Sequence, residues 1–168
     1  MARKKLIVIM GVSGSGKTTV AKHIAEYTSF KYMESDDFHS PENKAHMESG
    51  QPLTDEMRWP WVETICGAIE KSVDDIVLAN SGLKFAHRDR FRRLDRDCYF
   101  IHVKVPQEII QSRMEARAGH FMPASLLTSQ FRDMEKPAQG EVIFELDGRA
   151  SLSRMKAASL VCVQDITS

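Results

Sequence analysis

The chain has 168 residues, and its 23 lysines and arginines balance its 23 aspartates and glutamates, so no overall field favours nucleic acid or an anionic membrane as a partner. The length suits one compact domain with its own core, which we expect to span residues 1–168. The three cysteines form no Cys-x-x-Cys pair and no apolar run is long enough to cross a membrane, which favours a reduced, cytoplasmic protein.

A glycine-rich segment follows the first predicted strand, residues 6–10, and precedes a predicted helix. It reads Gly11-Val12-Ser13-Gly14-Ser15-Gly16-Lys17-Thr18, the pattern of a P-loop. Its glycines let backbone N–H groups approach a phosphate, and the helix adds the partial positive charge of its N-terminus. We predict that Lys17 reaches the β- and γ-phosphates of ATP and that Thr18 ligates the Mg²⁺ between them. The predicted ATP-binding residues here are Gly11, Val12, Ser13, Gly14, Ser15, Gly16, Lys17, Thr18 and Thr19.

A short second strand over residues 31–34 leads into an acidic group at residues 34–39. Ligands of parallel α/β sheets bind at the carboxyl edge of the strands, so this group should face the P-loop. We predict that Asp36 orients or deprotonates an acceptor hydroxyl, that Glu34 helps to hold Mg²⁺, and that His39 bonds the substrate. The competing interpretation is that these are solvated charges before a helix, where the helix dipole favours acidic residues.

Two helices follow, one from Ser40 and Pro41 to Glu48 and one over residues 55–72 that begins at a Thr54 cap. Apolar residues at helical spacing in the second helix predict a core-facing stripe. This stripe is Met57, Trp61, Ile65, Ala68 and Ile69.

The remaining predicted strands cover residues 75–80, 98–105 and 141–146, with helices over 84–93, 106–117 and 124–134 and a less clearly amphipathic tail after Gly148. Five strands alternating with helices predict a three-layer α/β/α domain with a five-stranded parallel sheet. The third strand ends in Asn80, where a complete Walker B motif has aspartate. This argues against motor-type ATPases and GTPases.

Cations near the predicted sheet edge favour an anionic substrate. Arg58, Lys84 and Arg88 lie in segments that border the substrate side. Each taken singly fits a solvated charge better, but their joint placement after strand ends favours an anionic substrate. Arg113 and Arg117 lie one helical turn apart, before a glycine-containing segment. We predict that both bind ATP and that residues 117–125 form a mobile lid over the triphosphate; the alternative is a salt-bridged surface face.

Motifs beyond the P-loop are more specific. The chain reads Asp36-Asp37-Phe38-His39, Pro52-Leu53-Thr54-Asp55, Ser81-Gly82-Leu83-Lys84, Gly119-His120-Phe121 and Ser129-Gln130-Phe131. In these motifs, and from about Leu6 to Leu146, it resembles the gluconokinases of the thermoresistant type, P-loop kinases related to the nucleoside monophosphate kinases and to shikimate kinase.

The resemblance implies ATP-dependent phosphorylation of D-gluconate to 6-phospho-D-gluconate, with Mg²⁺ supplied together with ATP. It implies a catalytic set of Lys17, Asp36 and Arg117, metal binding by Thr18 and Glu34, and a substrate-binding region at about residues 36–62. The implied substrate-binding residues are Asp36, His39, Arg58, Lys84, Arg88, His120 and Gln130. A homodimer is plausible on the same ground.

The chain departs from the family pattern at a few positions. Glu34 stands where the family usually has aspartate, Phe85 and His87 replace the usual lysine and tyrosine, and the tail after Asp147 does not match the expected terminal helix. Two alternatives therefore stay open: a kinase for another small sugar acid or polyol, and a nucleotide-binding regulator that has lost catalysis.

Overall fold

A single five-stranded sheet organises the molecule. The computed structural model describes residues 2–116 and 124–168, and all four pairs of neighbouring strands in it are parallel, in the order β2-β3-β1-β4-β5. The strands are β1 (Lys5–Met10), β2 (Lys31–Glu34), β3 (Ile76–Ala79), β4 (Asp97–Lys104) and β5 (Phe144–Asp147). The predicted five-stranded parallel sheet is confirmed.

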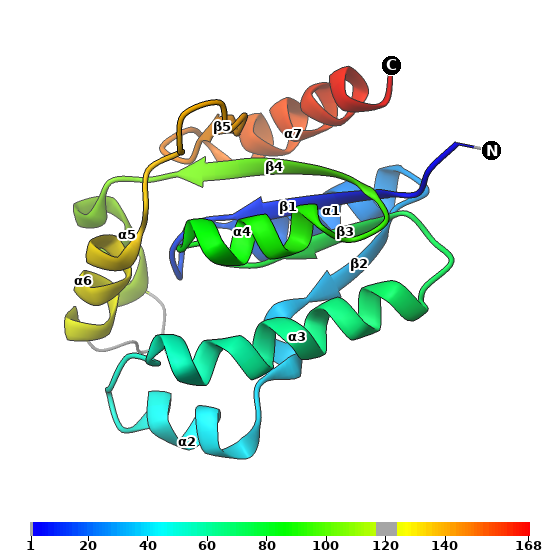
Figure 1. Cartoon of the computed structure of the whole chain (residues 1–168). Coiled ribbons are helices and arrows are strands. Elements are labelled where there is room, and N and C mark those ends of the chain that lie inside the picture. Colours follow the sequence, from blue (N-terminus) through cyan, green and yellow to red (C-terminus); the bar gives the residue numbers. More distant parts are fainter. Residues whose placement is uncertain (1, 117–123) are drawn as a thin grey trace.

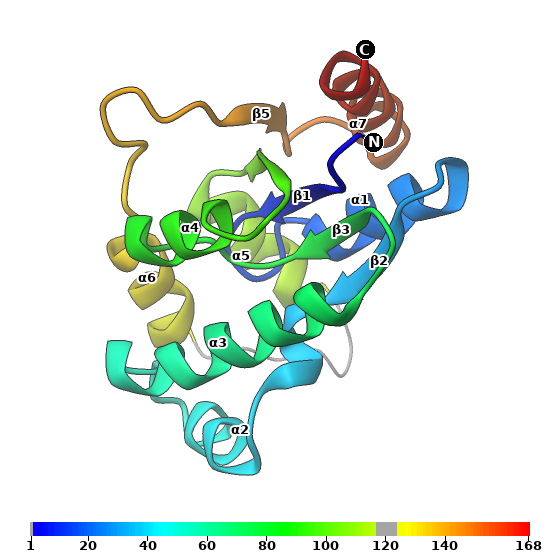
Figure 2. The ribbon, with the colours of Figure 1, turned by 45° about the vertical axis from the view of Figure 1, so that its right-hand side comes forward.

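Helices cover both faces of this sheet (Figure 1). They are α1 (Lys17–Tyr27), α2 (Pro41–Glu48), α3 (Asp55–Lys71), α4 (Phe85–Arg92), α5 (Gln107–Glu115), α6 (Ala124–Asp133) and α7 (Leu152–Thr167), with a 3₁₀ turn at Ser35–Phe38. The turned view in Figure 2 places α7 and α3 on opposite sides of the strands, which gives the predicted three layers.

The central strand β1 shows why the chain forms such layers. Ile7 and Ile9 pack on the α1 and α7 side, whereas Leu6 and Val8 pack on the α3 and α4 side, and all four are fully buried. A strand covered on both faces needs a continuous apolar run instead of an alternating one. The loop that leaves β1 is thereby anchored between two cores.

Local capping fixes the two helices that border the carboxyl edge. The Ser40 side chain accepts a hydrogen bond from the backbone N–H of Asn43, and the Thr54 side chain accepts one from that of Met57. Both predicted helix starts are confirmed. In α3 the buried side chains include Trp61, Ile65 and Ile69, but Met57 and Ala68 of the predicted stripe are only partly buried.

The C-terminal tail is the main correction to the predicted elements. It forms α7, which begins at a Ser151 cap and packs against α1 through Met155, Val163 and Ile166. Small residues between these positions weaken the apolar pattern, and Ser159 even faces the core fully buried. No helix in the described part of the chain combines the length and apolarity that crossing a membrane requires.

Candidate active site

A cavity of about 330 Å³ opens at the carboxyl edge of the sheet, a volume typical of small-molecule sites. It is bounded by the P-loop, the β2–α2 segment, α2, α3, the loop after β3, and α6. Its lining is Ser13, Lys17, Asp36, His39, Lys44, Met47, Pro52, Leu53, Arg58, Trp61, Ser81, Leu83, Leu126, Ser129 and Gln130. A larger cavity of about 720 Å³ beside β4 and β5 contains neither Lys17 nor Asp36. We therefore take the smaller cavity as the candidate active site.

The P-loop has the backbone conformation that its sequence predicts. Gly14 and Gly16 have φ angles of 79° and 100°, which side chains of L-residues rarely tolerate. The Gly11 N–H donates to the Ser81 carbonyl at 3.2 Å, which ties the loop to the end of β3. The Lys17 ammonium lies 3.5 Å from the Val12 carbonyl oxygen, so its side chain curls back over the loop.

The charges of Lys17 and Asp36 are set by their surroundings. Burial lowers the pKa of Lys17, while the negative charges of Asp36 and Glu34 oppose this shift. The contact with His39 lowers the pKa of Asp36 more than burial raises it, and Lys17 lowers it further. Asp36 is therefore ionised at neutral pH, the form in which a carboxylate accepts a hydroxyl proton.

His39 is held in a fixed orientation beside Asp36. Its ring stacks on Trp61 with centroids 4.3 Å apart, and its Nε2 lies 3.6 Å from Oδ1 of Asp36. The indole N–H of Trp61 donates to the Ser35 carbonyl at 2.8 Å, so the aromatic ring is itself anchored to the acidic turn. The structure thus brings both predicted residues, Asp36 and His39, into the cavity.

Thr18 and Glu34 offer oxygen ligands suited to Mg²⁺. The Thr18 hydroxyl donates to Oε2 of Glu34 at 2.9 Å, and the Tyr32 hydroxyl donates to the same oxygen. Burial and the Glu34 carboxylate both raise the pKa of Tyr32. The described residues hold no cluster of three or more His, Cys, Asp or Glu that would bind a metal alone. Two protein oxygens fit Mg²⁺ well, because this ion usually keeps waters and takes its other ligands from substrate phosphates.

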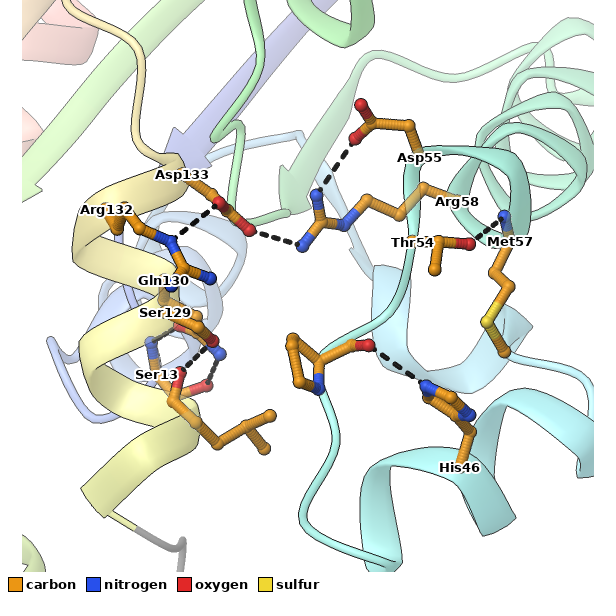
Figure 3. A network of polar contacts seen from close by, with 12 residues as sticks. Ser13, His46, Thr54, Asp55, Met57, Arg58, Ser129, Gln130, Arg132 and Asp133 are labelled. Atoms are coloured by element: carbon orange, nitrogen blue, oxygen red, sulfur yellow. Dashed lines mark hydrogen bonds and ion pairs between the residues drawn. The ribbon is translucent and has the colours of Figure 1, made fainter.

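Arg58 lies on the cavity wall between two carboxylates. Its Nη1 is 3.2 Å from Oδ1 of Asp55, on the same helix, and its Nη2 is 3.1 Å from Oδ2 of Asp133, at the end of α6. Figure 3 shows the guanidinium of Arg58 bridging from α3 to α6. Arg58, predicted to bind the substrate, therefore lines the cavity, and both of its terminal guanidinium nitrogens are already paired with carboxylates.

Gln130 also lines the cavity, and its amide is bonded to the P-loop. The Ser13 N–H donates to Oε1 of Gln130 at 2.8 Å, and Nε2 of Gln130 donates to the Ser13 hydroxyl at 3.1 Å (Figure 3). An N–H can only donate, so the amide oxygen must face it and the orientation of the amide is defined.

Arg88 does not reach the cavity, contrary to the role predicted for it. Its side chain is fully buried, with Nε 2.8 Å and Nη2 3.0 Å from the two carboxylate oxygens of Glu141. Its Nη1 also donates to the Gly82 carbonyl at 2.7 Å. Every edge of the guanidinium is thus used inside the protein, which is a structural role and not a ligand-binding one.

The remaining predicted residues lie elsewhere. Lys84 is the residue before α4 and does not line the cavity, and Nη2 of Arg113 donates to the Gly148 carbonyl at 2.7 Å. Thr19 lies in the first turn of α1. Arg117, His120 and the lid over residues 117–125, except for residues 124 and 125, fall outside the described residues.

Sequence reasoning missed one cation of the cavity. Lys44 of α2 lines it, and within the described part of the chain Lys44 has no ion-pair partner. The available signal was its position in the helix that directly follows the Asp36 turn. Two further polar residues of the lining, Ser81 and Ser129, open the motifs at residues 81–84 and 129–131, but neither was predicted as a site residue.

Comparison with known proteins identifies the family. A model described as an AAA domain matches residues 6–139. The gluconokinase of Gluconobacter oxydans (strain 621H) is 38% identical over 149 residues, which cover 87% of this chain and 84% of that protein. The chain belongs to the gluconokinase family. The predicted resemblance is confirmed by this match.

Solved structures agree with membership of the gluconokinase family. A gluconokinase from Sinorhizobium meliloti 1021 is 34% identical, with a TM-score of 0.88 over 99% of this chain and 95% of that one. An unliganded sugar kinase from Janibacter sp. HTCC2649 is 40% identical, with a TM-score of 0.89 over 96% of this chain and 95% of that one. The α/β P-loop kinase fold extends over nearly the whole chain.

Proposed function

We propose that the protein transfers the terminal phosphate of ATP to the 6-hydroxyl of D-gluconate, giving 6-phospho-D-gluconate and ADP. The observation that carries the proposal is the convergence of Lys17, Asp36 and Arg58 on one cavity in a member of the gluconokinase family. A P-loop lysine, a carboxylate and an arginine supply phosphate binding, hydroxyl activation and anion recognition.

In the proposed reaction the acceptor oxygen forms a bond to the γ-phosphorus while the bond from that phosphorus to the β–γ bridging oxygen breaks. Asp36 orients the hydroxyl and accepts its proton, and His39 holds Asp36 in place. Lys17 balances charge on the phosphates as ADP leaves. Mg²⁺, held by Thr18 and Glu34, would neutralise phosphate charge.

Acceptor recognition is assigned to the region at residues 36–62. Lys44 and Arg58 are the cations that would meet the gluconate carboxylate, and His39 offers a partner for a hydroxyl. Contacts of His120 and Lys84 with the substrate, and of Arg113 and Arg117 with ATP, stay predictions. So do the single domain over residues 1–168, the cytoplasmic location and the homodimer, the last of which light scattering would test.

The alternative of a changed substrate rests on Phe85 and His87, and the structure weakens it. Phe85 borders a different cavity, and His87 lies buried, edge-on against the Trp59 ring with the ring centroids 5.0 Å apart. Neither lines the candidate site. A change at these positions therefore does not alter the lining of the acceptor pocket directly.

The experiment is a coupled ADP-release assay with Mg-ATP and a panel of sugar acids that includes D-gluconate. Asp36→Asn keeps the side-chain shape and should lower kcat about 10²- to 10⁴-fold, and Lys17→Ala should abolish turnover. Asp37→Asn is the matched control, because this neighbouring carboxylate is exposed and does not line the cavity. ATP binding without turnover of any acceptor would contradict the proposal and support the silent regulator.

A further inference from the structure

Helix α6 touches both halves of the candidate site. Gln130 bonds the P-loop at Ser13, and Asp133, three residues later, pairs with Arg58 of α3. Residues three apart lie on neighbouring positions of one helix face. Figure 3 shows both contacts reaching out from α6, one toward Ser13 and one toward Arg58.

The backbone N–H of Ser13 is a candidate donor to the transferred phosphate. P-loop N–H groups bind phosphate oxygens, and Ser13 lines the same cavity as Asp36, the residue assigned to the acceptor hydroxyl. The phosphate nearest to the acceptor is the one transferred, which is the terminal phosphate of ATP. In this structure the amide oxygen of Gln130 accepts a hydrogen bond from the Ser13 N–H.

We propose that Gln130 is a specificity-determining residue that distinguishes ATP from ADP and links nucleotide binding to Arg58. In the absence of ATP, the Gln130 amide binds the Ser13 N–H at the position of the terminal phosphate. ATP displaces the amide, whereas ADP lacks the terminal phosphate and leaves the amide bound. A hydrogen bond to a charged phosphate oxygen is roughly twice as strong as one to a neutral amide, so ATP wins the exchange.

Displacement of Gln130 acts on Arg58 through Asp133. Because both residues project from α6, a displacement of Gln130 that moves the helix also loosens the 3.1 Å contact of Asp133 with Arg58. Arg58 then has one side of its fork available for the carboxylate of the acceptor. This second step rests on the proposed function, because it takes the acceptor to be an anionic sugar acid.

The first arm of the experiment uses nucleotide alone. Calorimetry with Mg²⁺ compares a non-hydrolysable ATP analogue with ADP on the full chain. Gln130→Ala should tighten binding of the ATP analogue about threefold to tenfold, because no hydrogen bond has to be displaced, and leave ADP unchanged. Gln130→Glu should weaken the ATP analogue relative to ADP, because its carboxylate repels the terminal phosphate. A merely structural role would move both nucleotides together.

Gln107→Ala is the matched control. Gln107 of α5 also contacts α6, through the Thr128 hydroxyl at 2.9 Å, but is not part of the cavity lining. It should leave the ratio of ATP-analogue to ADP affinity at the wild-type value. Equal ratios in wild type, Gln130→Ala and Gln130→Glu would overturn the proposal.

The second arm measures gluconate affinity with the ATP analogue or with ADP present. In wild type the ATP analogue should raise gluconate affinity about fivefold or more over ADP, and in Gln130→Ala this difference should vanish. A difference that persists in Gln130→Ala would refute the link to Arg58. If the wild-type protein binds no gluconate while the nucleotide affinities change as expected, the assigned acceptor is wrong. The role of Gln130 in distinguishing ATP from ADP is then still supported.

Discussion

The ion pair between Arg88 and Glu141 makes the substitution Glu141→Gln the sharpest test of the structure. The Glu141 side chain is only 2% exposed and accepts hydrogen bonds from Arg88, from Arg92 at 2.6 Å and from the Ala138 N–H at 2.9 Å. Burial alone would raise its pKa, but the bonds from Arg88, Ala138 and Arg92 outweigh burial and lower the pKa from 4.5 to about 2.

The size of the effect follows from this shift. A pKa lowered by that amount corresponds to about 3 kcal/mol of folding stability above pH 4.5, which is lost as the pH falls toward 2. Removing one partner of a buried ion pair costs roughly 3–5 kcal/mol, in agreement with this figure. Glu141→Gln should therefore lower the free energy of unfolding by about 3 kcal/mol at neutral pH, with the deficit shrinking by about 2 kcal/mol between pH 6 and pH 3.

Urea unfolding followed by tryptophan fluorescence at a series of pH values measures both quantities. Glu145→Gln is the control, because this glutamate of β5 is largely exposed and its Oε1 lies 3.9 Å from Nζ of Lys104. It should change stability by less than about 1 kcal/mol. A loss of stability below about 1 kcal/mol for Glu141→Gln, or a loss that does not depend on pH, would refute a stabilising role for the buried ion pair of Arg88 and Glu141.

Three further predictions test other parts of the molecule. Glu34→Gln removes the charge beside Thr18 and should raise the Mg²⁺ concentration for half-maximal activity about tenfold or more in a magnesium titration. Burial lowers the pKa of His87 from 6.5 to about 4, and the charge of Arg58 adds to this shift. The wild-type protein should therefore lose about 2–3 kcal/mol of folding stability as the pH falls from 6.5 to 4. His87→Phe should lack this loss when stability is measured by urea titration at the same pH values. A Cβ on Gly148 would lie 2.1 Å from Cγ2 of Val105, so Gly148→Ala should destabilise the folded protein by about 1–3 kcal/mol. Gly67 lies inside α3, and a Cβ there would meet nothing within 4 Å, so Gly67→Ala should be neutral or stabilising in the same measurement.

Features encoded by residues close in sequence were predictable. The P-loop, the helix start at Ser40 and Pro41, the Thr54 cap and the buried strands depend on contacts or patterns within a few residues. The carboxyl-edge rule for parallel sheets then placed Asp36 near Lys17 without knowledge of any side-chain contact, and both do line one cavity.

Features that depend on distant partners were not predictable. Arg88 reads as a free cation in the sequence, and its partner Glu141 lies 53 positions later. The contact of Gln130 with Ser13 spans 117 positions. A single sequence shows how many charges and amides the chain has but not which of them are in contact. Arg58 and Arg88 are both cations in helices, yet Arg58 lines the cavity as predicted and Arg88 does not.

The charge pattern of the described cavity suggests how this family member could bind two anions in one small space. The negative charges of Asp36 and Glu34 act on Lys17, and Arg58 pairs with Asp55 and Asp133 before any ligand arrives. Lys44, the third cation of the lining, has no ion-pair partner in the described part of the chain. Such partners keep buried cations paired, which an empty site needs because an unpaired buried charge is costly. An anionic ligand that binds Arg58 must then replace an internal contact instead of adding one. Binding of one ligand consequently changes what is available to the other, and this exchange is what the variants of Gln130 are designed to measure.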